Sequence, residues 1–145
     1  MTARTFALVI GIAYIAAGVL GFIPALLSAP PADAPHVGIT AFYGYLLGLF
    51  PVNVLHNLVH LAIGAWGIAA GRSVTGARTY AKSLAIIYGV LAILGLFPNA
   101  NTLFGLVPIH SHDIWLHAVT AVISAYFGWF AASRTETTGD RATVH

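Results

Sequence analysis

The sequence predicts an all-α fold: a four-helix transmembrane bundle built from two repeated hairpins. Three observations lead to this prediction. The chain of 145 residues is 59% hydrophobic and only 7% charged, which is too little charge for the surface of a soluble domain of this length. Four stretches are long and apolar enough to cross about 30 Å of hydrocarbon. Two segments of the first half of the chain also recur in the second half.

The predicted spans cover residues 6–27, 52–70, 80–97 and 113–132. Each is close to the roughly 20 residues that a helix rising about 1.5 Å per residue needs to cross a bilayer. The first span has a longer apolar core than a usual signal peptide, so we expect it to be retained.

Domain organisation follows from these spans. Residues 1–132 are predicted to form a single four-span membrane domain. Residues 133–145 are expected to be a disordered cytoplasmic tail.

The basic residues all lie at one side of the predicted bundle. They precede the first span, lie at the connection between the second and third, or follow the fourth: Arg4, Arg72, Arg78, Lys82, Arg134 and Arg141. The first and third connections, residues 28–51 and 98–112, contain no Lys or Arg. Because positive residues favour the cytoplasmic side, both termini are predicted to be cytoplasmic in a multi-pass protein of the inner (plasma) membrane.

The first outward connection contains a second apolar stretch, "GITAFYGYLLGLFP" at 38–51. It is too short to span a bilayer. We predict a short interfacial or re-entrant helix here, anchored by Phe42, Tyr43 and Tyr45 at the depth of the lipid headgroups.

The repeat appears as two pairs of similar segments. "YIAAGVLGFIP" (14–24) and "YGVLAILGLFP" (88–98) share Tyr, Gly and Pro at an offset of 74 residues. "FPVNVLHNLVHL" (50–61) and "VPIHSHDIWLHA" (107–118) share Pro and His at an offset of 57 residues. Both hairpins start from the cytoplasm, so the prediction is a parallel repeat with its pseudo-twofold axis along the membrane normal.

Five of the seven histidines lie at the outward ends of the second and fourth spans: His56, His60, His110, His112 and His117. His56 and His60 are four residues apart and share a helix face, as do Asp113 and His117. The pseudo-twofold axis would turn these two pairs toward each other. We therefore predict a metal site with His56, His60 and His117 as ligands and Asp113 as the fourth ligand or as an orienting hydrogen-bond partner.

The histidines, two asparagines and two tyrosines also have interpretations that involve no metal. Histidines within membrane helices usually make hydrogen bonds between helices, so a purely hydrogen-bonded polar network is the alternative to a metal site. Asn53 is expected to cap the second span and Asn57 to bond between helices, with support of a ligating histidine as the alternative. Tyr14 and Tyr88 are expected to pack helix against helix, and they are candidate relays if the site carries out one-electron chemistry.

Copper is the favoured metal, with zinc as the alternative. Three imidazoles and one carboxylate suit both ions, and the affinity of such sites for divalent ions generally peaks at Cu(II). The predicted function is redox chemistry or copper handling, acting on superoxide or dioxygen; as an enzyme, the protein would be a copper-dependent oxidoreductase. The expected partners are the lipid bilayer, a metal ion or small molecule from the outward side, and a second copy of the chain or a membrane redox partner.

Two other function classes stay open. His60 and His117 could be axial ligands of a b-type haem in an electron-transfer protein, or the chain could be a non-enzymatic scaffold with a buried polar network. The absence of cysteine excludes disulfides and thiolate metal sites. A net charge of +2 from scattered residues gives no indication of nucleic-acid binding.

Three motifs carry a family resemblance: "HNLVHL" (56–61), "LGLFP" (94–98) and "DIWLH" (113–117). Over residues 5–132 the chain resembles a family of small four-helix bacterial membrane proteins of unknown function that carry HNxxH and DxxLH motifs. The resemblance implies the four-helix fold and a polar cluster formed by the two motifs. Copper binding is an assignment that suits such a cluster, and the resemblance itself implies no activity.

Overall fold

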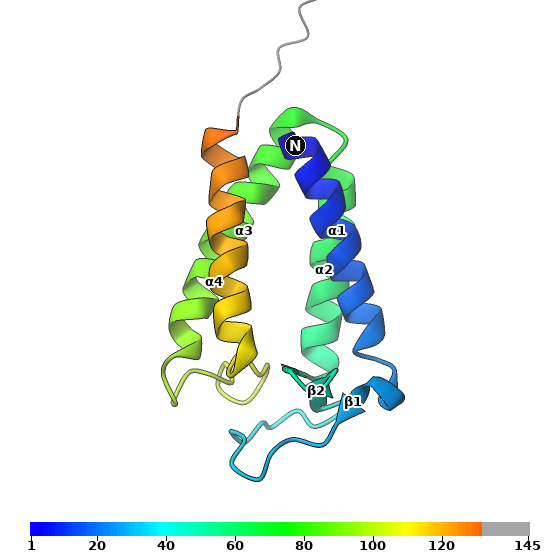
Figure 1. Ribbon diagram of the computed structural model, residues 1–145, viewed down its shortest axis with the longest axis vertical. Coiled ribbons are helices and arrows are strands. Elements are labelled where there is room, and N and C mark those ends of the chain that lie inside the picture. The colour runs from blue at the N-terminus through cyan, green and yellow to red at the C-terminus, as the bar shows by residue number, and fades with distance from the viewer. Residues whose placement is uncertain (132–145) are drawn as a thin grey trace, which may run out of the picture.

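The computed structural model describes residues 1–131, and the predicted tail at 133–145 lies outside this part of the chain. Within residues 1–131 the fold is mostly helical, as predicted. The main elements are α1 (Ala3–Leu20), α2 (Val54–Ala70), α3 (Val74–Gly95) and α4 (His112–Ala125), which one π-helical turn, η2 (Tyr126–Phe130), continues. Figure 1 shows the four helices as two pairs, α1 beside α2 and α3 beside α4.

Side-chain caps and glycines set where the helices begin and end. Thr2, Asn53 and Ser73 each accept a hydrogen bond from the backbone N–H three residues later, at the starts of α1, α2 and α3. Gly21 and Gly71 follow the last residues of α1 and α2. These caps satisfy backbone groups that the helix itself leaves free.

Two helices support an association with a membrane. By length and composition, α1 and α3 are apolar enough to cross a bilayer, while α2 is apolar but has only 17 residues. The crossing of a bilayer by all four helices stays a prediction.

The first connection differs from its prediction. Residues 38–51 do not form an interfacial or re-entrant helix; they contribute two strands of a small antiparallel sheet in the order β1-β2-β3. The strands are β1 (Leu27–Ser28), β2 (Gly44–Leu46) and β3 (Phe50–Val52), and a 3₁₀ turn, η1 (Pro24–Leu26), precedes β1.

Local turn chemistry explains this correction. Leu47 and Gly48, between β2 and β3, both have positive φ angles of 53° and 74°. Such angles suit a tight hairpin connection and are incompatible with a right-handed helix. Pro51 lies in β3, which is an edge strand of the sheet, where a missing N–H is tolerated. Aromatic content indicated an interfacial helix, but Gly48 favours a turn at this point and Pro51 disfavours a helix.

Asn53 joins the first and third connections to the start of α2. Its side chain accepts a hydrogen bond from the backbone N–H of His56 at 3.0 Å, and its Nδ2 donates to the carbonyls of Ile39 and Leu106 at 3.1 and 2.8 Å. The predicted capping role of Asn53 is thus confirmed. Because the Asn53 side chain is fully buried and bonded to both connections, the first turn of α2 is held in place relative to them.

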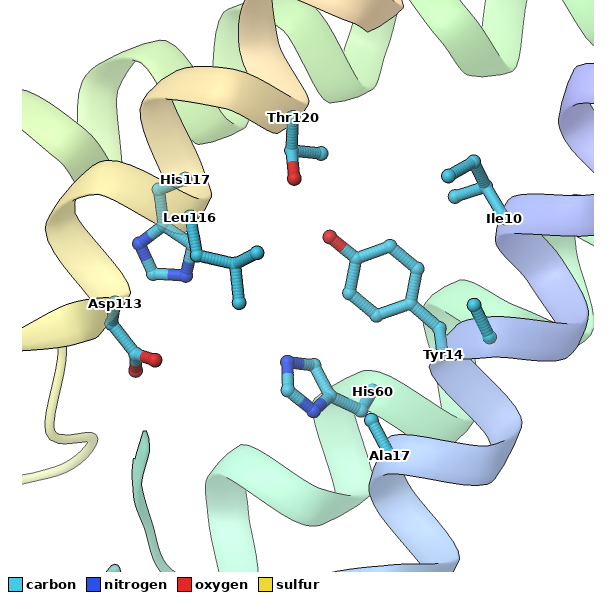
Figure 2. Close-up of a pocket in the computed structure, with 9 residues that line it drawn as sticks. Ile10, Tyr14, Ala17, His60, Asp113, Leu116, His117 and Thr120 are labelled. Carbon is cyan, nitrogen blue, oxygen red and sulfur yellow. The ribbon is translucent and has the colours of Figure 1, made fainter. Parts of the chain in front are cut away.

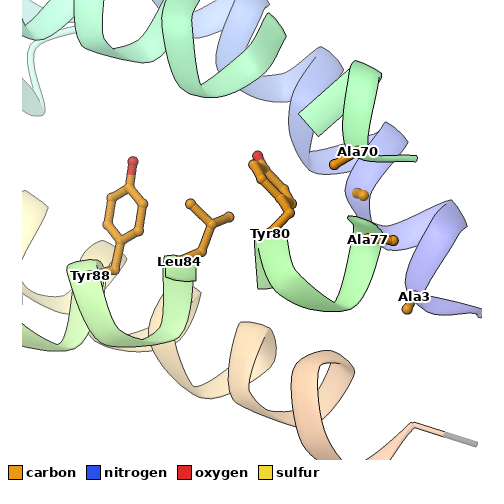
Figure 3. Close-up of a cluster of buried hydrophobic side chains, with 7 residues drawn as sticks. Ala3, Ala70, Ala77, Tyr80, Leu84 and Tyr88 are labelled. Atoms are coloured by element: carbon orange, nitrogen blue, oxygen red, sulfur yellow. The ribbon is translucent and has the colours of Figure 1, made fainter. Parts of the chain in front are cut away.

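The core lies along one face of α3. Tyr80, Leu84 and Tyr88 are spaced three to four residues apart and are at most 2% exposed, which is the helical spacing of a buried face. Figure 3 shows these side chains pointing from α3 toward α1 and α2, with the buried alanines of the cluster at the end of the row nearest Tyr80. These small residues allow the two hairpins to approach closely at the end of the molecule where α1 begins and α2 ends.

The repeat is visible in how the helices meet. Gly21 faces the side chain of Asn57 in the first hairpin, and Gly95 faces the side chain of Ile114 in the second. Gly95 is related to Gly21 by the offset of 74 residues, and Ile114 is related to Asn57 by the offset of 57. A Cβ atom added at Gly95 would lie 2.9 Å from Cγ1 of Ile114, so both hairpins need glycine at this contact.

Candidate metal centre

Three of the four predicted ligands converge at one point between the hairpins. His56 comes from the first turns of α2, and Asp113 and His117 come from the first turns of α4. All three side chains are buried, with 3–4% of their surface exposed. One possible ligand atom from each lies within 4.8 Å of the others. A tetrahedral site with bonds of about 2.1 Å spaces its ligand atoms roughly 3.4 Å apart, so a modest closing of this group would give that geometry.

His60, the fourth predicted ligand, lies beside this group rather than within it. Its ring centroid is 4.4 Å from that of His56, one turn earlier on α2. Figure 2 shows His60 facing the same space as Asp113 and His117. His60 thus lines one cavity together with Asp113 and His117, and a second cavity together with His56 and His117.

Three unpaired polar atoms lie at this cluster. Within residues 1–131, several buried side-chain atoms have no hydrogen-bond partner, among them Nδ1 of His60, Nδ1 of His117 and Oδ2 of Asp113. Leaving a buried polar atom unpaired costs about 1–3 kcal/mol, and native proteins contain few such atoms. Imidazole nitrogens and a carboxylate oxygen are also the donor set that transition metals such as zinc and copper prefer. The residues present therefore fit a transition-metal ion.

The orientation of His56 is fixed by a backbone carbonyl. Nδ1 of His56 is 3.1 Å from the carbonyl oxygen of Pro51. When Nδ1 donates its proton there, Nε2 carries the lone pair, which is how proteins commonly hold a ligating histidine. Oδ2 of Asp113 lies 3.9 Å from the same Nδ1, beyond normal hydrogen-bond distance. The role of the Pro51 carbonyl was not predicted, although Pro51 belongs to the repeated segment.

The remaining histidines lie outside the three-residue group. His110 is buried near Tyr45, with ring centroids 6.1 Å apart, and burial lowers its pKa. His112 is exposed and its ring is close to those of Phe50 and Trp115. His36 is exposed, and His145 lies outside the described residues.

Asn57 does not have the hydrogen-bonding role that was predicted for it. It is fully buried, and neither its Oδ1 nor its Nδ2 has a hydrogen-bond partner within the described chain. The predicted bond between helices is thus not seen, because the side chain packs directly against Gly21 at the end of α1.

Two tyrosine–histidine pairs flank the cluster. The rings of Tyr14 and His60 are 5.1 Å apart at 56°, and those of Tyr88 and His117 are 5.0 Å apart at 54°. The repeat offsets relate Tyr14 to Tyr88 and His60 to His117. The two tyrosine rings stack at 5.6 Å, which confirms that they pack helix against helix. The two pairs thus have closely matching geometry, as the repeat predicts.

A comparison with protein families gives one match. The model of a family described as a domain of unknown function, DUF4383, matches residues 4–130. The chain belongs to this family. The matched range includes α1 from its second residue, all of α2, α3 and α4, and every candidate ligand.

Membership of DUF4383 agrees with the resemblance to small proteins of unknown function, and it assigns no activity. Neither the curated proteins nor the solved structures contain a significant match to the chain. For this DUF4383 protein, the function therefore has to be inferred from the geometry of the site.

Proposed function

We propose that this chain is an integral membrane metalloprotein that holds one transition-metal ion between its two hairpins, near the outward end of the bundle. The supporting observation is the convergence of His56, Asp113 and His117, all buried, on one point. His60 is proposed as the fourth ligand, because it faces the same volume and has an unpaired buried nitrogen. Burying such groups without a partner would cost several kcal/mol, and a metal ion would offset this cost.

Copper is the metal we favour, and zinc is the alternative. The donor set of imidazoles and one carboxylate suits both ions, and Cu(II) is bound more tightly than the other divalent ions of its row at most such sites. A copper ion would supply one-electron redox chemistry, so the proposed role is redox or copper handling, with superoxide or dioxygen as the small molecule from the outward side. The protein's own contribution would be to orient the ligands, chiefly through the bond from His56 to Pro51, and to exclude bulk water.

The metal proposal is tested by elemental analysis of the full chain purified in detergent from cells grown with copper and zinc. We expect about one equivalent of copper per chain. An electron paramagnetic resonance spectrum should show nitrogen ligation of Cu(II). Protein that is free of metal after purification and takes up none on addition of either ion would contradict the proposal.

The proposed topology follows from the positions of the charges in the fold. Nε of Arg4 donates to the carbonyl of Gly71 at 3.0 Å, so the N-terminus and the α2–α3 connection lie at one end of the molecule. The candidate metal ligands lie near the starts of α2 and α4, at the other end (Figure 1). Because positive residues favour the cytoplasmic side, we propose that the metal site faces outward.

Cysteine labelling tests this topology, since the natural chain has no cysteine. Ala32→Cys introduces a thiol in the exposed first connection, and Thr75→Cys introduces one at the exposed start of α3. In intact cells, a membrane-impermeant maleimide should label the Ala32→Cys variant, and it should label the Thr75→Cys variant only after permeabilisation. The opposite pattern would show an inverted topology, and labelling of both variants in intact cells would contradict the membrane proposal.

The two alternatives make different predictions. A haem protein would show a Soret band, but the cavities of about 220 and 80 Å³ beside the histidines are below the roughly 300–1,000 Å³ of pockets that hold large ligands. A scaffold with a polar network would bind no metal and would tolerate His→Gln changes. No observation in residues 1–131 favours either alternative over the metal site.

A further inference from the structure

Two cavities lie on opposite sides of the histidine cluster, and the repeat relates them. The larger, which we call the α1/α4 cavity, has a volume of about 220 Å³; the smaller, the α2/α3 cavity, has about 80 Å³. His60 and His117 line both cavities. The offsets of 74 and 57 residues map most of the lining of one cavity onto that of the other, including Tyr14 onto Tyr88 and His117 onto His60.

Part of the difference in volume comes from substitutions between the repeats, and part from residues of the third connection, which line only the smaller cavity. Ala13 and Ala17 of α1 line the larger cavity, and the corresponding residues of α3, Ile87 and Leu91, fill the smaller one. Thr120 of α4 likewise corresponds to Ile63 of α2. Small residues therefore line one side of a nearly symmetric cluster, and larger residues line the other. Packing alone gives no reason for this asymmetry, because the other repeat shows that bulkier side chains fit.

The α1/α4 cavity combines apolar walls with polar groups at its two ends. Figure 2 shows Asp113, His117 and His60 toward one end, and the hydroxyl of Tyr14 directed toward that of Thr120 at the other. His117 is 4% exposed, and its Nδ1 has no hydrogen-bond partner within the described chain. A molecule seated between these ends would meet hydrogen-bonding groups on both sides and apolar contacts around its middle.

The cavity opens to the apolar flank of the molecule. Ala13 and Leu116 line it and are also exposed, so they lie at its mouth. The surface on either side of the mouth is apolar, with Ile12 61% exposed on α1 and Val119 46% exposed on α4. In the proposed membrane protein, this flank would face lipid, and a ligand would enter from the hydrocarbon.

The volume indicates the size of the ligand. A cavity of about 150 Å³ lined by apolar side chains binds benzene, so a cavity of about 220 Å³ takes one ring with several small substituents. We propose that the α1/α4 cavity binds the ring of a 1,4-quinone dissolved in the bilayer. One carbonyl oxygen would accept a hydrogen bond from the ring N–H that His117 keeps when its other nitrogen binds the metal, and the opposite one would accept from the hydroxyl of Tyr14 or Thr120. This proposal rests on the proposed membrane location and places the quinone ring next to the proposed metal site.

The test is calorimetric titration of the detergent-purified full chain with duroquinone, a tetramethyl-1,4-benzoquinone. The matched probe is durene, the same tetramethylated ring without the two oxygens. We expect saturable binding of one duroquinone per chain, at least tenfold tighter than durene after correction for partition into detergent. Equal binding of both probes, or no saturable binding of duroquinone, would overturn the proposal.

Variants locate the binding in the cavity. The double variant Ala13→Ile/Ala17→Leu introduces side chains like those of the second repeat and should weaken duroquinone binding at least tenfold. Ala16→Leu adds similar volume at an exposed position of the same helix and should change binding less than twofold. Thr120→Val, which removes only a hydroxyl, should weaken binding about fivefold and serves if the double variant does not fold. Undiminished binding in the folded cavity variants would overturn the proposal.

Metal content measured on the same samples separates the two proposals. Duroquinone binding by protein that holds no metal would contradict the metal site alone. Protein with one equivalent of metal and no duroquinone binding would contradict the quinone proposal alone.

Discussion

Replacing His117 with alanine is expected to lower the bound transition metal from about one equivalent to less than a tenth. His117 is one of the three buried residues whose ligand atoms lie within 4.8 Å of one another. It is the only histidine in that group from the second hairpin, so its loss leaves Asp113 as the sole ligand from α4. Loss of a residue that only orients a ligand typically costs 10–100-fold in metal affinity, and loss of a ligand itself should cost at least as much. Elemental analysis after gel filtration of the detergent-purified variant measures the effect.

Two further variants make this result interpretable. His36→Ala removes an exposed histidine of the first connection and should leave the metal content unchanged. His60→Ala should weaken binding less than His117→Ala does, because His60 lies beside the three-residue group rather than within it. Equal metal content in wild type and His117→Ala would show that the ion is bound elsewhere, and equal losses in all three variants would indicate unspecific binding to histidines.

The helices and the pairing of polar residues could be predicted because both depend on regular periods. Apolar stretches of about 20 residues indicate helices, and a spacing of four residues puts His56 and His60 on one helix face. The repeat added long-range information, since it relates His60 to His117 across the bundle from the sequence alone. For this reason the residues of the cluster could be named from the sequence, together with the end of the bundle where they lie.

The sheet in the first connection could not be predicted in the same way. Residues 38–51 are apolar and aromatic, which suits either a helix at an interface or buried strands. The outcome depends on the positive φ angles of Leu47 and Gly48 and on the pairing of β2 with β1. The pairing joins Leu27 with Leu46, and such contacts between distant segments leave no periodic signal in either segment.

The orientation of the site side chains also could not be predicted from the sequence. The sequence grouped His56 and His60 as equivalent ligands, but the bond from His56 to the carbonyl of Pro51 and the packing of His60 against Tyr14 separate their roles. The asymmetry of the two cavities, in contrast, can be seen by aligning the two repeats, in which Ala13 corresponds to the larger Ile87. The sequence alone does not show that this difference creates a cavity, because only the fold shows that these positions border the histidine cluster.

Replacing Gly64 with alanine is expected to destabilise the protein by about 2–3 kcal/mol, the upper part of the usual range of roughly 1–3 kcal/mol for overpacking a close contact. A Cβ atom at Gly64 would lie 2.7 Å from the backbone oxygen of Gly11 and 2.7 Å from the backbone nitrogen of Ile15. Backbone atoms cannot rotate away as a flexible side chain can, so α1 and α2 would have to separate. Close approach over small residues is also a principal source of helix association in membranes.

The matched control is Gly89→Ala on α3, where an added Cβ would meet only Cβ of Ala121 at 3.9 Å. This change should alter stability by no more than about 1 kcal/mol, the difference in helix propensity between glycine and alanine. Unfolding of both variants by titration with denaturing detergent, followed by circular dichroism, compares them directly. Because Tyr14 of α1 packs against His60 of α2, separation of α1 from α2 should also weaken metal binding in Gly64→Ala. Equal stability of the two variants would mean that the first hairpin does not depend on close contact between its backbones, and the position of His60 beside the other ligands would then need another cause.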